Sequence, residues 1–419
     1  MIAFAAYTLI PEITRSLAII GLLRTPTQTL KQGDFVIIED TVNCEDIHYH
    51  SPSRTLYTAC EDTIDTRMGW FPPLEIFHNA STGANSTGSI HDMTSRRLQF
   101  ENFSGTFVTH GIDVLSDPDR PEEAVYIFAV NHVPDDNFVR LQRHSGYTHS
   151  SFYASNKSAS RIELFHHVVG SPTLRHVRSI QHHLIRTPND IFALSPQSFY
   201  VTNDHYYKEG WMRRFELLYR GAKWSDTIYV HFDESIRSTR DGVQAKPALS
   251  GIHTNNGLGH GKLGQILVSS SASGLLNIGE VPDDPRQGGI NLVDFVEVDS
   301  FVDNPSWFED SFASVSHNAS GLIIPGMSKM TDVPRFLKGT SRGLAGRVWH
   351  AIPASQHGRS QKHKWDVRLL LEDDGTLVNA ISSAVMVAID PGLESGKRKA
   401  WLFVSGFLAR NIIATKVDI

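Results

Sequence analysis

Short apolar segments, rather than long amphipathic stretches, dominate the hydrophobic pattern of this chain. Each segment is rich in β-branched or aromatic residues and is bounded by Gly, Pro, Asp, Asn or Ser, which is the pattern of a β-strand between turns. The predicted strands include residues 35–38, 55–58, 124–130, 161–165, 199–202, 227–230, 266–268 and 401–404. Residues 11–23 form the best helical stretch. The pattern therefore predicts an all-β protein.

A weak repeat is superimposed on these strands. The order turn, polar residues, strand, short loop, strand recurs roughly every 45 to 65 residues, close to the length of a four-stranded propeller blade. No low-complexity linker or composition shift marks a domain boundary. We expect a six-bladed β-propeller over residues 31–419, with polar residues from the inner strand ends meeting at a central channel.

Residues 1–30 are expected to form a separate apolar, helical segment. Two apolar runs, 1–10 and 17–23, are interrupted by Pro11, Glu12 and Arg15. Neither run reaches the 18 or so apolar residues of a membrane span. A signal peptide would start with basic residues and end at a small-residue cleavage site, and neither is clear here. Two interpretations stay open: a signal or lipid-surface anchor, and a helix packed on the domain.

Composition excludes several classes of protein. The 419 residues are 40% apolar and 20% charged, and 39 basic against 45 acidic residues give a net charge of −6. This balance argues against a nucleic-acid partner bound through phosphate neutralisation. The only cysteines, Cys44 and Cys60, are too few for a cysteine-rich zinc site.

Five N-glycosylation sequons give a weak indication of secretion. A short sequon arises by chance, so the count decides little by itself. The sequons begin at Asn79, Asn85, Asn102, Asn156 and Asn318. Together with the apolar N-terminal segment, they lead us to expect a secreted or membrane-associated glycoprotein.

Scattered Asp, Asn, Glu and His residues carry the candidate chemistry. Carboxylate and carboxamide oxygens are ligands that Ca²⁺ prefers, whereas thiolates are scarce and the histidines lack zinc-motif spacing. A nucleotide-binding loop is absent from the sequence, and we do not expect a serine-hydrolase triad. The glycine-rich stretch 257–264 lacks the phosphate-loop pattern, and we interpret it as a turn within a blade.

A more specific signal lies in residues 161–206. This stretch ends with Thr202-Asn203-Asp204-His205-Tyr206, and the surrounding chain supplies Glu45-Asp46, His110-Gly111-Ile112 and Asp303-Asn304 in order. With these motifs the chain resembles the serum paraoxonase/arylesterase family, calcium-dependent lactonases and esterases on a six-bladed propeller. The resemblance covers roughly residues 31–419 and is weakest over 325–364.

The resemblance implies roles for individual residues. Two Ca²⁺ ions are implied, one catalytic and one structural. The implied ligands of the catalytic ion are Glu45, Asn189, Asn256, Asp303 and Asn304. Those of the structural ion are Asp46, Asp190 and the backbone carbonyl of Ile112. His110 and His132 resemble a histidine dyad, and the implied site-lining residues are Asn203, Asp204, His205 and His317.

Two features depart from the vertebrate members. Those proteins tie the two chain ends with a disulfide, but residues 401–419 contain no cysteine here, so closure must come from strand pairing. Cys44 and Cys60 flank one predicted hairpin and either pair with each other or stay free. The loops 69–95 and 306–313 also differ, and loops shape the mouth of a pocket, so the natural substrate is not determined.

Ester hydrolysis, on lactones and aryl esters with a side activity on organophosphate triesters, is the expected function. A bound Ca²⁺ would stabilise an oxyanion, and a histidine with an ordinary pKa of about 6.5 can accept a proton from water. His110 is the expected base, with His132 orienting it; the rival assignment makes Asp303 the base or nucleophile. Alternative functions are a non-enzymatic calcium-binding interaction module, or a propeller resembling sugar lactonases and strictosidine synthase.

Overall fold

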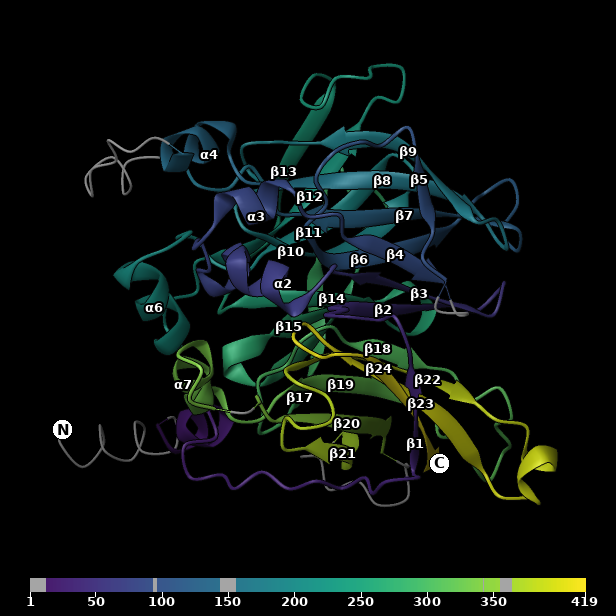
Figure 1. The fold of residues 1–419 in the computed structure, drawn as a ribbon. Coiled ribbons are helices and arrows are strands. Elements are labelled where there is room, and N and C mark those ends of the chain that lie inside the picture. Colours follow the sequence, from purple (N-terminus) through teal and green to yellow (C-terminus); the bar gives the residue numbers. More distant parts are fainter. Residues whose placement is uncertain (1–12, 93–95, 144–155, 342, 355–363) are drawn as a thin grey trace.

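The protein is a six-bladed β-propeller. The computed structural model describes residues 13–92, 96–143, 156–341, 343–354 and 364–419. Its strands form six sheets, and the helices gather at one end of the strands (Figure 1). All the strands predicted from the apolar segments are present, so the all-β prediction and the six-bladed architecture are confirmed.

Each blade is one antiparallel sheet, with a single parallel edge strand in the second. Blade 1 contains β2 (Asp46–His50), β3 (Thr55–Cys60) and β4 (Ser89–Asp92). Blade 2 contains β5 (Gln99–Glu101), β6 (Thr109–Ser116), β7 (Ala124–Asn131), β8 (Arg161–Val168) and β9 (Thr173–Ile180). Blade 3 contains β10 (Pro188–Ser195), β11 (Ser198–Asn203), β12 (Ser225–Phe232) and β13 (Val243–Ile252). Blade 4 contains β14 (Asn255–His260), β15 (Ile266–Ser270), β16 (Leu275–Glu280) and β17 (Asn291–Glu297). Blade 5 contains β18 (Ser306–Phe308), β19 (Gly321–Met327), β20 (Gly346–Pro353) and β21 (Trp365–Asp373). Blade 6 contains β22 (Ile381–Ala388), β23 (Lys399–Gly406), β24 (Ile412–Asp418) and β1 (Phe35–Ile38).

The innermost strands form a closed ring. β2 contacts β6, β6 contacts β10, and the contacts continue through β14, β18 and β22 back to β2. Because these strands surround the axis, residues at their starts are brought together although they are far apart in the sequence.

Strand pairing closes the propeller, as the cysteine-free tail predicts. β1 pairs antiparallel with β24, from Phe35 opposite Thr415 to Ile38 opposite Ile412, so the first strand of the chain completes the last blade. Cys44 and Cys60 form a disulfide across the β2–β3 hairpin of blade 1. The disulfide therefore strengthens one hairpin and does not join the two ends of the chain.

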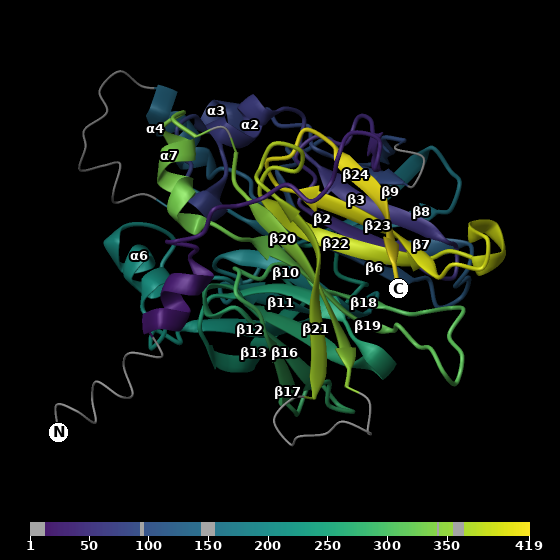
Figure 2. The ribbon, with the colours of Figure 1, turned by 90° about the horizontal axis from the view of Figure 1, so that it is seen from below.

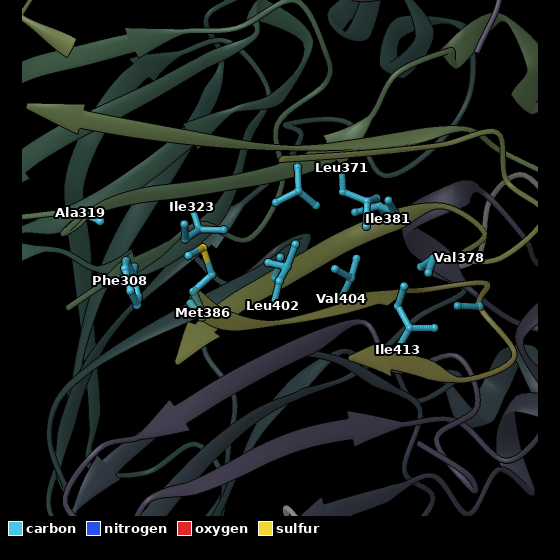
Figure 3. Close-up of a cluster of buried hydrophobic side chains, with 14 residues drawn as sticks. Phe308, Ala319, Ile323, Leu371, Val378, Ile381, Met386, Leu402, Val404 and Ile413 are labelled. Atoms are coloured by element: carbon cyan, nitrogen blue, oxygen red, sulfur yellow. The ribbon is translucent and has the colours of Figure 1, made fainter. Parts of the chain in front are cut away.

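Hydrophobic residues pack between the blades. Neighbouring sheets lie face to face, so both faces of a blade are buried against another sheet. One large cluster fills the space between blades 5 and 6 and includes Phe308, Ile323, Met386, Leu402 and Ile413, all almost completely buried (Figure 3).

Short helices in the connections were not predicted from the sequence. They are α2 (Ile64–Gly69), α3 (Ala80–Ala84), α4 (Asp136–Arg143), α6 (Trp211–Leu218) and α7 (Val333–Leu337), with 3₁₀ turns η1 (Pro72–Leu74), η2 (Lys262–Gly264), η3 (Ser271–Ser273), η4 (Met330–Asp332) and η6 (Pro391–Glu394). Helices α4, α6 and α7 lie at the same edge of the molecule in both views (Figures 1 and 2). The interpretation of 257–264 as a turn was wrong for its first half: residues 257–260 belong to β14, and η2 forms the turn.

The N-terminal segment packs on the propeller where it is described. Residues 13–19 are helical, and Ile19 is fully buried in a cluster with Phe71, Phe301 and Phe407. Arg15 donates to the carbonyl oxygen of Ser273 at 3.1 Å. Residues 1–12 lie outside the described residues. Over the parts of the chain described, no helix is both long and apolar enough to span a membrane.

Candidate active site

Polar side chains from four blades converge at one end of the channel. Glu45 directly precedes β2, Asn189 lies in β10, Asn256 lies in β14, and Asp303 comes just before β18. All four line a cavity of about 200 Å³ at the helix-covered end of the propeller, together with His110. Each predicted ligand therefore comes from the start of an innermost strand.

The five predicted ligands of the catalytic ion share one feature. Each has a side-chain oxygen that is buried and has no hydrogen-bond partner among the described residues. These oxygens are Glu45 Oε2, Asn189 Oδ1, Asn256 Oδ1, Asp303 Oδ1 and Asn304 Oδ1. An unpartnered buried acceptor costs about 1–3 kcal/mol, so five at one site need a common partner. Five oxygen donors fit a calcium ion, which takes six to eight.

Hydrogen bonds inside the set fix two of these oxygens. The Nδ2 atom of Asn304 donates to Glu45 Oε1 at 2.8 Å, which leaves Asn304 Oδ1 and Glu45 Oε2 free. The backbone of Asn304 is held as well, because its amide donates to the carbonyl oxygen of Ser382 in blade 6. The set is thus positioned without a ligand.

The electrostatics of the site also favour a cation. Burial, with the nearby charge of Asp46, raises the pKa of Glu45 to about 8. Burial, followed by repulsion from Glu45 and Asp46, raises the pKa of Asp303 well above its usual value. Carboxylates buried beside one another are stabilised in their charged form only by a neighbouring positive charge.

Asparagine amides set this site apart from an all-carboxylate or histidine centre. Among the residues described, no group of three or more His, Cys, Asp or Glu side chains is arranged to hold a metal ion. The set of five oxygens is consistent with this absence, because only Glu45 and Asp303 belong to those four residue types. The other three members, Asn189, Asn256 and Asn304, are asparagines.

The predicted second ion has weaker support. Both oxygens of Asp46 already accept hydrogen bonds, Oδ1 from Ile47 and Ser383 and Oδ2 from the backbone amide of Ile112. Asp190 accepts from the amides of Ile191 at 2.8 Å and Leu258 at 2.6 Å. This second set has no unpartnered carboxylate oxygen, in contrast to the first.

Close strand approach at the site requires glycine at two positions. A Cβ on Gly257 would lie 2.6 Å from Asn304 Oδ1, and one on Gly111 would lie 2.4 Å from Asp190 Oδ1. Both distances are below any normal contact, so these glycines allow neighbouring inner strands to bring their polar residues together.

His110 and His132 form a hydrogen-bonded pair beside the ligand set. His110 lies in β6 and His132 follows β7, and His132 Nε2 is 3.1 Å from His110 Nδ1. On its other side His132 Nδ1 is 2.9 Å from Ser160 Oγ, while His110 Nε2 is 3.8 Å from Glu45 Oε1. The pair therefore links the ligand set to Ser160.

Both imidazoles are neutral at neutral pH. Burial lowers the pKa of His132 to about 3. Burial, then the charges of His132 and Arg67, lowers the pKa of His110 well below its usual value. Phe71 packs edge-on against His110, with 5.2 Å between ring centroids, and restricts the ring. A neutral imidazole has a lone pair that can accept a proton, but the lowered pKa makes each of these imidazoles a weaker base than a free histidine.

The predicted site-lining residues divide into two groups. Asp204 and His205 line the cavity, with His205 Nδ1 3.0 Å from Asp204 Oδ2. Asn203 instead holds a loop, because its Oδ1 accepts from the amides of Arg186 and Thr187. His317 is exposed between β18 and β19 and does not line this cavity, because β18 leads away from the ligand set before the chain reaches it.

Sequence reasoning missed three contributors to the site. Arg67 in α2 is fully buried and donates to the carbonyl oxygens of Thr109 and Asn43. Ser382 and Ser383 supply the contribution of blade 6, because Ser382 Oγ donates to the Glu45 carbonyl at 2.5 Å. A polar position at the start of each predicted inner strand was the signal that would have found the two serines.

Comparison with known proteins finds relatives that match part of this chain. The Arylesterase family model matches residues 148–256. Serum paraoxonase/arylesterase 1 of Mus musculus is 33% identical over 129 residues, which is 31% of this chain and 29% of that protein. Its Homo sapiens counterpart is 32% identical over 143 residues, 34% of this chain and 30% of the relative. The matches thus span about a third of these relatives.

Solved structures give only a distant likeness. A Pseudomonas aeruginosa periplasmic gluconolactonase has a TM-score of 0.38 and 9% identity, covering 90% of this chain and 85% of that one. A Dyadobacter fermentans protein of unknown function has a TM-score of 0.47 and 8% identity, covering 93% and 99%. The six-bladed fold therefore rests on the sheet topology.

Proposed function

Because the family model and the curated relatives support membership of the serum paraoxonase/arylesterase family, we propose that this chain is a calcium-dependent hydrolase of lactones and aryl esters. The observation that carries the proposal is the set of five buried, unpartnered oxygens beside a neutral histidine pair. A side activity on organophosphate triesters belongs to the same proposal, because a phosphoryl oxygen resembles the carbonyl oxygen of an ester.

Different residues of the site have different roles in the proposed hydrolysis. A calcium ion held by Glu45, Asn189, Asn256, Asp303 and Asn304 would supply Lewis acidity for the developing oxyanion. His110 accepts a proton from the attacking water, whose oxygen bonds to the substrate carbonyl carbon. The ester C–O bond then breaks, and the leaving alkoxide takes back the proton held by His110 to give an alcohol; the carboxylic acid releases its own proton to solvent and becomes a carboxylate. His132 orients His110 and is oriented in turn by Ser160.

Asp303 is the rival base. Its Oδ1 faces the same site and is unpartnered, so the structure leaves two candidate proton acceptors in one cavity. Phenyl acetate and a lactone series, assayed with and without EGTA, test the proposal. We expect chelation and Asp303→Asn each to abolish turnover, and His110→Asn to lower kcat by about 10²–10⁴-fold while calcium binding persists.

Controls separate a lost ion from a lost base. Calorimetric calcium titration of each variant reports the ion directly, and Asp366→Asn, at an exposed position in β21, should retain wild-type turnover. Full activity in EGTA would refute the calcium-dependent mechanism. Near-normal activity of His110→Asn would transfer the base role to Asp303.

The alternative functions have separate signatures. An interaction module would bind calcium and turn over none of these substrates. A sugar lactonase would hydrolyse aldonolactones and leave phenyl acetate intact. The match of residues 148–256 to the Arylesterase model favours the first proposal.

We also propose that the cavity mouth rests on a lipid surface. Ile19 of the N-terminal segment, Leu217 of α6 and Val333 of α7 share one apolar cluster, and neighbouring side chains on these elements point to solvent. Trp211 is 74% and Leu218 71% exposed. The fraction of protein that sediments with phosphatidylcholine vesicles should fall for the double variant Trp211→Ala/Leu218→Ser. It should stay at the wild-type level for Leu393→Ser, because Leu393 is 80% exposed but lies on η6. Equal sedimentation of both would refute this surface.

We propose that the protein is secreted and glycosylated, because its sequons are accessible to solvent. All five sequon asparagines are exposed. Protein expressed in secretory cells should therefore shift in mobility after endoglycosidase treatment, and an unchanged mobility would count against glycosylation.

A further inference from the structure

A second cavity lies on the far side of the histidine pair. It has a volume of about 140 Å³ and is lined by His132, whereas His110 lines the main cavity. Pro73, Asp204 and Arg213 line both cavities and so form the wall between them. We call this second space the side cavity.

Four basic side chains line the side cavity, and three of them are neutralised by carboxylates. Lys157 pairs with Glu209. Arg213 lies 3.2 Å from Asp204. Arg186 makes two contacts with Asp226, at 2.8 and 2.9 Å. These pairs leave no net charge of their own on the walls.

Lys208 is the fourth cation, and among the described residues it makes no ion pair with a carboxylate. Its ammonium donates to the amide oxygen of Asn156 at 2.9 Å. Although much of the side chain is exposed, partial burial lowers the pKa of Lys208; the charge of Asp135 opposes this shift and that of Arg186 adds to it. Arg186 contributes a buried Nε atom that has no partner among the described residues. Cations in this situation are stabilised by a bound anion.

The side cavity opens towards one further cation. A neighbouring cavity shares Asn156, Ser158, Ser160, Arg186 and Lys208 with it and adds Asp135, His182, His183 and Arg240. An anion that approaches through this cavity passes Arg240, whose positive charge, partly offset by Asp135, raises the local anion concentration.

We propose that the side cavity binds a small carboxylate through Lys208. The identity of the anion rests on the proposed function, because ester or lactone hydrolysis releases a carboxylate close to this cavity. An ammonium and a partner-free guanidinium nitrogen can both donate charge-assisted hydrogen bonds to carboxylate oxygens. The same chemistry serves the product acid or a carboxylate on the substrate.

Calorimetric titration of the calcium-loaded protein with 4-hydroxybutyrate tests this site without measuring turnover. We expect Lys208→Gln to weaken binding about tenfold, the size of one charge-assisted hydrogen bond. Lys208→Arg should restore most of it. Lys223→Gln removes the same charge at an exposed position outside both cavities and should bind like wild type. Equal affinity in Lys208→Gln and Lys223→Gln would overturn the proposal.

A kinetic arm distinguishes the two sources of the carboxylate. Monophenyl succinate carries a distal carboxylate, and phenyl butyrate has a similar chain without it. If substrate carboxylate is bound, wild type favours the succinate ester and Lys208→Gln loses that preference. If product is bound, the preference is unchanged and Lys208→Gln loses inhibition by 4-hydroxybutyrate. Lys208-dependent binding in a protein that hydrolyses neither ester would refute the proposed function alone.

Discussion

At the scale of single residues, buried oxygens without hydrogen-bond partners are the main support for the proposed chemistry. Asn256 and Asp303 are ordinary turn residues in the sequence, where Asx side chains commonly bond to their own backbone. In the structure their Oδ1 atoms are buried and unpartnered at one cavity. The residue type allowed a ligand role, and the absence of any local partner supports it.

His350 gives a prediction of pH dependence at this scale. It lies fully buried in β20, where Nε2 donates to the Ala319 carbonyl at 3.0 Å and Nδ1 accepts from Arg368 at 3.3 Å. Burial, with the charge of Arg368, lowers its pKa to about 4. The unfolded chain, with a histidine pKa of about 6.5, binds the proton more readily. The contribution of neutral His350 to the free energy of unfolding is therefore fully present above pH 6.5 and is lost as the pH drops towards 4.

Replacement by glutamine removes this contribution. His350→Gln keeps a donor and an acceptor but does not titrate, so its urea midpoint should fall less than that of wild type between pH 6.5 and 4. Each pH unit in this window costs wild type up to about 1.4 kcal/mol from this residue. Parallel curves for the two proteins would show that His350 does not control acid stability.

At the scale of elements, the sequence predicted strands well and short helices poorly. Strands such as β7 are apolar along most of their length, because both faces of a blade are covered by neighbouring sheets. Helix α6 has only eight residues, and its apolar side chains Trp211 and Leu218 are exposed while Arg213 and Glu216 are buried, the reverse of a core-facing helix. Its position depends on polar contacts such as the hydrogen bond from Arg213 to the Pro73 carbonyl oxygen, which the hydrophobic pattern does not reveal.

The β2–β3 hairpin shows a local feature that the sequence left open. Cys44 and Cys60 were placed at the ends of one predicted hairpin, where pairing and free thiols were both allowed. Antiparallel pairing of Asp46 with Ala59 brings the two cysteines opposite each other, and they form a disulfide. Register, which depends on the whole blade, settled the question.

At the scale of the whole molecule, stability depends on closing the ring. Phe35 of β1 packs against the cluster between blades 5 and 6, whereas Val36 of the same strand is 56% exposed. Phe35→Ala should lower the free energy of unfolding by about 1–3 kcal/mol, less than a fully buried phenylalanine, through the cavity that it leaves. Val36→Ala should change it by less than about 0.5 kcal/mol.

Denaturant unfolding of both variants at constant calcium measures this difference. A loss for Phe35→Ala no larger than that for Val36→Ala would show that β1 contributes little to closure. Because the closing strand comes from the start of the chain and its partner from the end, the result also reports how far the propeller unfolds as one unit.

The sequence by itself determined the strands, the blade count and the identity of most candidate ligands. Apolar runs bounded by turns specify strands locally, and the Thr202–Tyr206 motif carried the resemblance to a family. Tertiary structure decided which polar residues meet. It brought Glu45 and Asn304 within 2.8 Å across 259 positions, and it placed His317 elsewhere. The side cavity also depends on folding, because Lys157, Arg186 and Arg213, which line it, form ion pairs with Glu209, Asp226 and Asp204, whereas Lys208 forms none among the described residues.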